Sequence, residues 1–320
     1  MSGRGGLPSS DALWRRVVHV LAAPARRCRR GLRRGYLGEG EGRPPRPGRR
    51  CGWRAAAGLV AALASAQPAA PAGAPGRVVS INLCTDQLAM MLAAPGQLVS
   101  VSSMARDPRM SAMVAEAAEH HVNHGGAEAV FRLDPDLVLA GRHTTRATVR
   151  LLRRLGVPVE EFAPARDFDD VRANIARVGA ALGREGAAEA LVAEFDARLA
   201  ALRAEAGRAP EAALYYANSF TAGAESLAGH ILAAAGLSNI APQGGVLPLE
   251  RLIMRAPELV VRGARYPGGS RAEEVLAHPA LRALLAGRPA APLADADWVC
   301  GTPHLLRAVG RLRDARETLE

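Results

Sequence analysis

The stretch Glu128–Gly141, with the sequence EAVFRLDPDLVLAG, is repeated as ERLIMRAPELVVRG at Glu250–Gly263. The copies are 122 residues apart, and the glutamate, the proline, the acidic residue after it and the closing glycine stay in register. In each copy a helical segment meets a proline, which ends it, and an apolar run typical of a buried strand follows. The repeat therefore predicts two lobes of similar architecture in one chain.

The prolines and glycines of the repeat shape the junction between helix and strand. We expect Pro135 and Pro257 to hold the residue before them extended and to direct the chain into the strand. Gly141 and Gly263 end the strands and leave loops at their carboxyl ends, where open α/β sheets bind ligands. Duplication of a good junction explains these residues. It explains the two glutamates less well, because the helix dipole would favour an aspartate or a neighbouring position about equally.

The positive charge of the chain lies in its first 66 residues. They contain 14 arginines and three acidic residues, a net charge of +11, whereas residues 67–320 have a net charge of −1. Because the larger part is balanced and lacks aromatic platforms or basic helices, we expect no nucleic-acid partner.

The same leader ends like a secretory signal peptide. An arginine-rich stretch precedes the apolar segment 55–66, which closes with the small residues Ala64-Ser65-Ala66. The segment is too short to span a membrane. We expect cleavage after Ala66, by the Sec or the twin-arginine route, with residues 67–76 as a linker.

The rest of the chain alternates strand and helix patterns, which is typical of parallel α/β sheets. The alternation occupies residues 77–183 and starts again over 208–320. Between them, residues 184–207 lack strand signals and place apolar residues at helical spacing. The predicted fold is therefore two Rossmann-like α/β lobes joined by one long, rigid helix.

Three segments together resemble a known family: RVVSINLCTDQLAMML (77–92), AEAVFRLDPDLVLAG (127–141) and LERLIMRAPELVV (249–261). They are similar to the periplasmic substrate-binding proteins of iron-siderophore and cobalamin ABC importers, and the resemblance covers about residues 77–318. It implies a class III periplasmic binding protein, monomeric and without enzymatic activity or an intrinsic cofactor. It further implies a partner complex of permease and ATPase, with Glu128 and Glu250 presented to arginines of the permease.

Loops that follow the strands supply the candidates for a ligand groove between the lobes. The nine candidates are Met104, Arg106, Arg142, His143, Tyr216, Phe220, Arg265, Tyr266 and Trp298. Trp298 resembles a groove tryptophan of cobalamin receptors, and packing under the terminal helix is its alternative. The three arginines can pair with carboxylate or catecholate oxygens. We therefore expect a ferric siderophore first and cobalamin second, with a haem or metal-ion receptor, or an exported α/β enzyme, as alternatives.

Histidines and cysteines near these loops leave further alternatives open. Four histidines lie there: His120, His121, His124 and His143. Their spacing matches no tight metal site, so we expect no bound metal, although haem or metal contact remains the alternative. Cys84 and Cys300 follow the leader, and an oxidising compartment permits a disulfide between them across the groove. Two free buried thiols are the other option.

Overall fold

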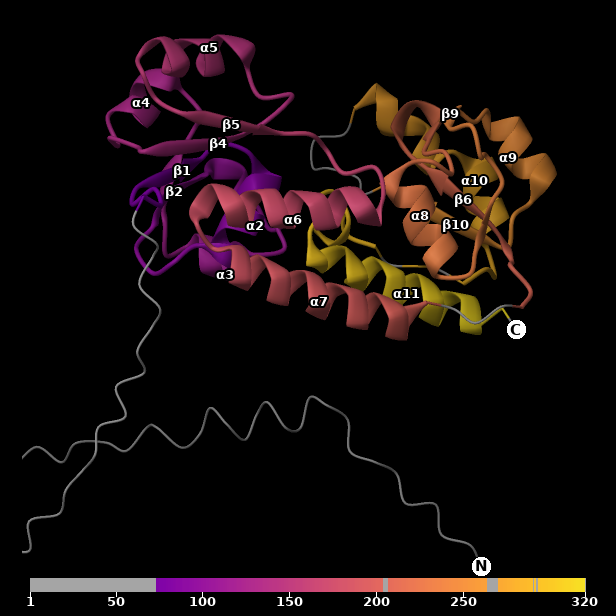
Figure 1. Ribbon diagram of the computed structural model, residues 1–320. Helices are drawn as coiled ribbons and strands as arrows, with labels where there is room; N and C mark the ends of the chain where they lie inside the picture. The colour runs from indigo at the N-terminus through magenta and orange to yellow at the C-terminus, as the bar shows by residue number, and fades with distance from the viewer. Residues whose placement is uncertain (1–72, 204–206, 264–269, 290, 292, 320) are drawn as a thin grey trace, which may run out of the picture. The chain divides into compact units, whose positions relative to one another are not determined.

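The computed structural model describes residues 73–203, 207–263, 270–289, 291 and 293–319. The predicted signal peptide and the first part of the linker lie outside these residues. Ala66–Glu320 form one compact unit, whose elements are shown in Figure 1. No helix in the described part of the chain is both long and apolar enough to cross a membrane.

A five-stranded sheet forms the centre of the first lobe. All its strands are parallel, in the order β3-β2-β1-β4-β5. They are β1 (Val78–Ser80), β2 (Leu98–Ser102), β3 (His121–Asn123), β4 (Leu137–Gly141) and β5 (Val159–Phe162). The direction of winding reverses between β1 and β4, so their carboxyl ends flank the crevice that doubly wound sheets use for ligands.

Helices cover both faces of this sheet, because successive strand residues point to opposite sides. Val78 packs into the core that contains residues from 83–92 and 168–182, which form helices α2 and α6, and Val79 packs into a second core with α4 and α5 (residues 127–131 and 146–154). The helices of this lobe are α2 (Leu83–Leu92), η1 (Ser103–Arg106), α3 (Val114–Ala117), α4 (Ala127–Phe131) and α5 (Arg146–Arg154).

The second lobe has a smaller parallel sheet in the order β10-β6-β8 and a short antiparallel ribbon of β7 and β9. The strands are β6 (Glu211–Tyr215), β7 (Phe220–Thr221), β8 (Ser238–Asn239), β9 (Gly245–Val246) and β10 (Leu259–Arg262). Its helical segments are η2 (Ala217–Ser219), α8 (Leu227–Ala234), α9 (Leu249–Arg255), η3 (Arg271–Ala277), α10 (Pro279–Leu285), η4 (Asp295–Asp297), η5 (Pro303–Leu305) and α11 (Leu306–Glu317).

One long helix, α7 (Glu185–Leu202), connects the two lobes, and α6 of the first lobe packs beside it. α6 (Phe168–Leu182) ends at Gly183, whose φ of 65° permits the left-handed turn that reverses the chain. α7 then runs beside α6 from the first lobe towards the second (Figure 1). The sequence predicted a bridging helix over 184–207. In the structure the helix ends earlier, at Leu202, because the backbone of Arg203 is extended. The lobe limits 77–183 and 208–320 remain a prediction.

The repeat reappears in the structure, with one correction. Glu128 and Glu250 lie in the first turns of α4 and α9, and the strands β4 and β10 follow the prolines. The sequence predicted extended backbone at the residue before each proline, and this prediction is wrong. Asp134 and Ala256 instead have φ values of 49° and 46°. A left-handed residue closes each helix while its N–H still reaches a carbonyl of the last turn, at 3.0 Å in both copies.

The last part of the chain returns to the first lobe and is bonded to it. The sequence left the state of Cys84 and Cys300 open, and the structure joins them in a disulfide. Cys84 lies in the first turn of α2, and the hydroxyl of Thr302 donates to Gln87 Oε1 of the same helix at 3.1 Å. After this contact α11 packs on α7 and α8, so one continuous core connects α2, α7 and α11.

A buried carboxyl group fixes α2 against the sheet. Asp86 has no exposed surface; it accepts the backbone N–H of Ser102 at 3.1 Å and the hydroxyl of the same residue. Burial raises the pKa of Asp86 from 3.8 to about 6, although the hydrogen bonds from Ser102 oppose the rise. The folded protein therefore binds this proton more tightly than the unfolded chain does.

The pKa of Asp86 predicts a pH-dependent stability. Its contribution is fully present below about pH 4 and is lost as the pH rises through about 6, where the buried group must ionise. Asp86→Asn keeps the acceptor for Ser102 N–H and cannot ionise. As the pH rises from 4 to 7.5, the unfolding free energy of the variant relative to that of the wild type should increase by about 3 kcal/mol, measured by urea unfolding. Parallel pH curves for the two proteins would contradict the assignment. Half-buried His304, whose pKa is lowered to about 4 mainly by desolvation, is common to both proteins, so its effect cancels.

Removal of the disulfide should destabilise the protein. The double variant Cys84→Ser with Cys300→Ser should lose about 2–4 kcal/mol of unfolding free energy, because the unfolded chain regains the freedom that a long closed loop removes. Dithiothreitol should lower the unfolding midpoint of the wild type to that of the variant and leave the variant unchanged. An equal effect of dithiothreitol on both proteins would show that this bond is not the cause.

Candidate ligand-binding site

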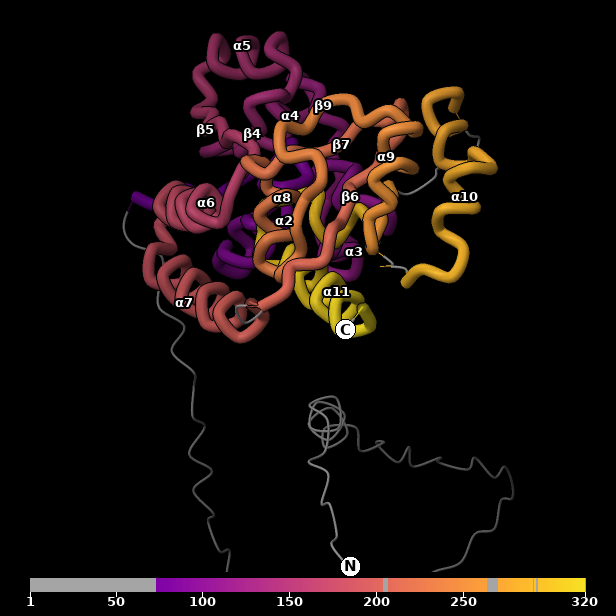
Figure 2. Tube along the Cα trace, turned by 90° about the vertical axis from the view of Figure 1, so that its right-hand side faces the viewer, coloured from indigo at the N-terminus to yellow at the C-terminus, as the bar shows by residue number. Residues whose placement is uncertain are grey.

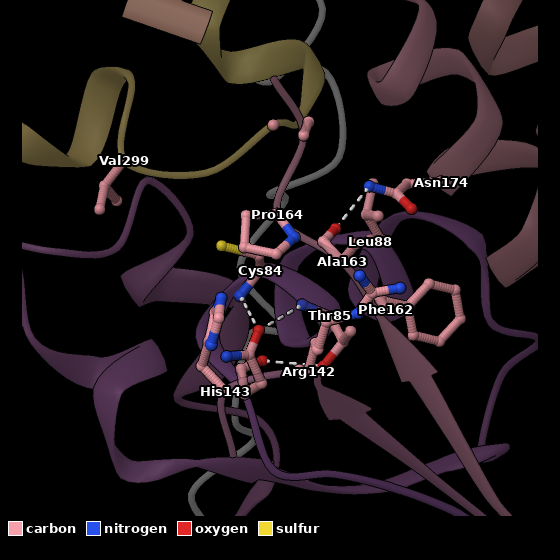
Figure 3. A pocket seen from close by; sticks show the side chains of 14 residues that line it. Cys84, Thr85, Leu88, Arg142, His143, Phe162, Ala163, Pro164, Asn174 and Val299 are labelled. Atoms are coloured by element: carbon pink, nitrogen blue, oxygen red, sulfur yellow. Dashed lines mark hydrogen bonds between the residues drawn. The ribbon is translucent and has the colours of Figure 1, made fainter. Parts of the chain in front are cut away.

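A pocket of about 160 Å³ lies at the carboxyl ends of β1, β4 and β5, at the point where the winding of the first sheet reverses. Figure 3 shows the side chains of Arg142, His143 and Cys84 gathered around it, with Val299 reaching it from a separate segment. Its lining is Asn82, Cys84, Thr85, Leu88, Gly141, Arg142, His143, Phe162, Ala163, Pro164, Ala165, Asn174, Val299 and Gly301.

Asn82 and Gly141 form the floor of this pocket. Asn82 follows β1 and caps α2, because its Oδ1 accepts from the N–H groups of Cys84 and Thr85 at 3.1 and 3.4 Å. A Cβ at Gly141 would lie 2.7 Å from Nδ2 of Asn82, so any larger residue at the end of β4 would have to displace this capping side chain. The N-cap of α2, Asn82, is thus packed directly against the last residue of β4, Gly141.

Arg142 gives the pocket its positive charge, and the imidazole of His143 lies next to it in the sequence. Both follow β4 directly and are exposed, and the backbone N–H of Arg142 donates to Phe162 O at 2.8 Å. That bond holds the loop to the end of β5 while the guanidinium stays available. No aspartate or glutamate belongs to the described lining, so the pocket favours a ligand with negative charge.

The C-terminal segment forms the opposite wall. Val299 is 44% exposed, and Gly301 packs so closely on the segment after β5 that a Cβ would lie 2.4 Å from the Cβ of Ala165. The disulfide at Cys84 lies in the same wall. The pocket is therefore built by residues far apart in the sequence and depends on the return of the chain to α2.

The second lobe contributes aromatic side chains to the groove candidates. Tyr216 follows β6 as Asn82 follows β1, and a Cβ at Gly263 would lie 3.0 Å from its Cδ1. The rings of Tyr216 and Trp298 are 6.2 Å apart and tilted by 55°. Trp298 also packs against the main core, and burial raises the pKa of Tyr216 far above its ordinary value. Phe220 is 54% exposed on β7.

Met104 and Arg106 do not line the pocket. Met104 is 43% exposed on η1, outside the lining of the pocket. The guanidinium of Arg106 donates to the carbonyls of Ala117, Ala118 and His120 at 3.2, 3.2 and 2.6 Å. It therefore closes the end of α3. Arg265 and Tyr266 lie outside the described residues.

The histidines do not meet in one place. The Nδ1–H of His120 donates to Leu98 O at 3.1 Å, His121 and His124 are exposed, and His143 alone of the four lines the pocket. Within the described ranges, no three His, Cys, Asp or Glu side chains are arranged to hold a metal ion.

The two glutamates of the repeat are both on the surface. Glu128 is 84% exposed and forms an ion pair of 3.3 Å with Arg132, which is itself 70% exposed. Glu250 is exposed too, and no salt bridge joins it to another described residue. Neither glutamate contributes to the lining of the pocket.

Sequence reasoning named Arg142 and His143 for the groove, and both line the pocket. Cys84, named for a possible disulfide, lines it as well. The prediction missed the segment Phe162–Ala165 and the residues Asn174, Val299 and Gly301. A signal existed for the first, because it also follows a predicted strand. Val299 and Gly301 flank Cys300, so the possible disulfide with Cys84 was the signal for their return to the first lobe.

Comparisons with known proteins place this fold in a family. The periplasmic binding protein family matches residues 78–289. A cobalamin-binding protein of Halobacterium salinarum is 32% identical over 206 residues, 59% of this chain and 54% of that protein. The chain thus spans about half the length of the curated relatives it matches.

Two solved structures share the architecture. A periplasmic heme-binding protein of Pseudomonas aeruginosa is 25% identical, with a TM-score of 0.59 over 75% of this chain and 92% of that one. A periplasmic vitamin B12-binding protein of Vibrio cholerae is 18% identical, with a TM-score of 0.59 over 76% and 97% of the two chains.

These matches confirm the predicted fold of two α/β lobes with a long helix between them. The family consists of binding proteins, so the prediction that the chain is not an enzyme is confirmed by the family match. Because the match covers more than half of the sequence and the structure agrees with it, the chain belongs to the periplasmic binding protein family.

Proposed function

We propose that this protein is the solute-binding component of an ABC importer, which captures a metal chelate between its lobes and delivers it to a membrane permease. The observation that carries the proposal is the basic pocket at the reversal point of the first sheet, lined by Arg142 and His143 and free of carboxylates in its described part. Open α/β sheets bind ligands at this point.

The charge of the pocket and the aromatic pair of the second lobe favour an anionic ligand with a flat or apolar part. The Arg142 guanidinium can pair with two oxygens of a carboxylate or catecholate. The rings of Tyr216 and Trp298 offer an aromatic surface from the second lobe. A ferric siderophore combines these properties, so it is our first choice of ligand.

Cobalamin is the second candidate, because the Halobacterium salinarum relative is named for it. Haem is the third, with support from the Pseudomonas aeruginosa structure and from the imidazole of His143 in the pocket. The pocket of about 160 Å³ is smaller than the roughly 300–1,000 Å³ typical of small-molecule sites. Any of these chelates would therefore fill it with one edge and extend into the groove.

Delivery requires a contact with the permease, and the exposed Glu128 and Glu250 are its proposed points. One carboxylate on each lobe gives a two-point dock to arginines, in which the charges also orient the partners. Export to the periplasm, through the signal peptide read from residues 1–66, belongs to the same proposal.

The ligand class can be tested by thermal and chemical unfolding with a catecholate siderophore, a carboxylate siderophore, cyanocobalamin and haemin. The true ligand at 100 times its Kd should add about 2.7 kcal/mol to the unfolding free energy. Stabilisation by none of the four, together with turnover of a small substrate, would refute the binding function.

The role of Arg142 gives a sharper test. Arg142→Ala should weaken binding of an anionic chelate about 10- to 100-fold, because it removes a charge-assisted hydrogen bond. The matched control is Arg146→Ala, which removes an exposed arginine of α5 that does not line the pocket. Equal losses in both variants, measured by titration calorimetry, would assign the effect to overall charge.

Docking predicts a separation of affinity from transport. Glu128→Ala with Glu250→Ala should leave the Kd of the chelate unchanged and reduce cellular uptake of the labelled chelate at least tenfold. Glu189→Ala, which removes an exposed carboxylate from α7, should have no effect on uptake. Normal uptake in the double variant would exclude these glutamates as the dock.

A further inference from the structure

We propose that Phe131 and Ile253, each one helical turn after a docking glutamate, are apolar anchors of the permease-binding surface. This inference rests on the proposed docking role of Glu128 and Glu250, and it adds a second type of contact at each point. Each dock would then be a carboxylate with an apolar side chain beside it, repeated once per lobe.

The first lobe shows the arrangement on α4. Val130 is fully buried in the core beneath the helix, so α4 has one face fixed against the sheet. Glu128 and Phe131 are three residues apart and share the outward face. Phe131 is 43% exposed although it is a large apolar residue. Its neighbour Arg132 pairs with Glu128 only at the surface, where such a pair contributes little.

The second lobe repeats the arrangement on α9. Leu252, which corresponds to Val130 in the repeat, is also fully buried. Glu250 and Ile253 have the same spacing and share the exposed face, where Ile253 is 37% exposed. The next residue, Met254, is 85% exposed and enlarges the apolar surface. No described residue forms a salt bridge with Glu250, so its carboxylate is ready for a cation from outside.

The matching register is what distinguishes these residues from ordinary surface apolar side chains, which need no explanation when they occur singly. In both helices the order is carboxylate, then buried aliphatic residue, then exposed apolar residue. Folding explains the buried residue, since it completes the core. It does not explain the exposed part of the apolar residue at the next position in both lobes, because apolar surface left in water contributes no stability.

The position and chemistry of the two sites fit one kind of partner. Figures 1 and 2 place α4 and α9 on the side of the protein away from α7 and α11, so both can meet one surface. Two like sites match a partner of two like subunits, each with an arginine next to an apolar depression. An apolar flank excludes water from the ion pair, which strengthens the attraction between carboxylate and arginine.

The test uses the full-length protein and the permease–ATPase complex of its source cell, purified in lipid nanodiscs. Phe131→Ser and Ile253→Ser should each raise the Kd for the complex about tenfold, and together more than either alone. Because the charges remain, the salt dependence of binding should stay as in the wild type, whereas Glu128→Ala and Glu250→Ala should flatten it. Phe131→Leu should restore most of the affinity.

The control is Leu155→Ser, which removes a 45%-exposed apolar side chain at the end of α5 with no docking glutamate on its helix. A normal Kd for both serine variants, with weakened binding in the glutamate variants, would overturn the anchors and leave the proposed dock intact. An equal loss in Leu155→Ser would overturn the pairing with the glutamates. Normal binding by the glutamate variants would instead refute the dock itself. Unchanged chelate affinity and unfolding midpoint would show that each variant is folded.

Discussion

The contact between Asn82 and Gly141 is the constraint on which the ligand pocket depends. Asn82 lies two residues after β1, caps α2 and occupies the volume that a side chain at Gly141 would need. β1 and β4 pair in parallel on the two sides of the point where the winding of the sheet reverses, and this contact packs their carboxyl ends together. The loop that carries Arg142 can then extend over the crevice without filling it.

A second set of contacts fixes the C-terminal segment to this framework. The disulfide of Cys84 and Cys300, the hydrogen bond from Thr302 to Gln87 and the close packing of Gly301 on Ala165 all lie within three consecutive residues of that segment. They cross from the end of the chain to the first lobe at the edge of the pocket. Because α11 continues from the same segment and packs on α7, large relative movements of the lobes would have to strain these contacts. A ligand must therefore be accommodated mainly by loops.

The parts of the fold that follow from local sequence were predictable. Apolar runs placed β1, β4 and β10, and the loops after strands led to Arg142 and His143. The conformation of Asp134 and Ala256 was predicted wrongly, because the preference before proline is for extended backbone and the need to close the preceding helix prevailed. Val299 and Gly301 were missed, since their place depends on tertiary packing and its signal was the disulfide of Cys300, which the sequence left open. For Cys84 and Cys300, a separation of 216 residues gives no information on distance.

The repeat has kept its outer faces and changed its inner ones. On the outside, Val130 and Leu252 are equally buried and the residues before the prolines share an unusual conformation. At the groove, the glycines that end β4 and β10 are covered by different side chains, Asn82 in one lobe and Tyr216 in the other. The proposed dock with two like sites would keep the two docking helices alike, whereas the proposed chelate would allow the walls of the groove to differ. The repeat shows both features, because the buried residue and the helix end are shared and the groups that cover the glycines are not.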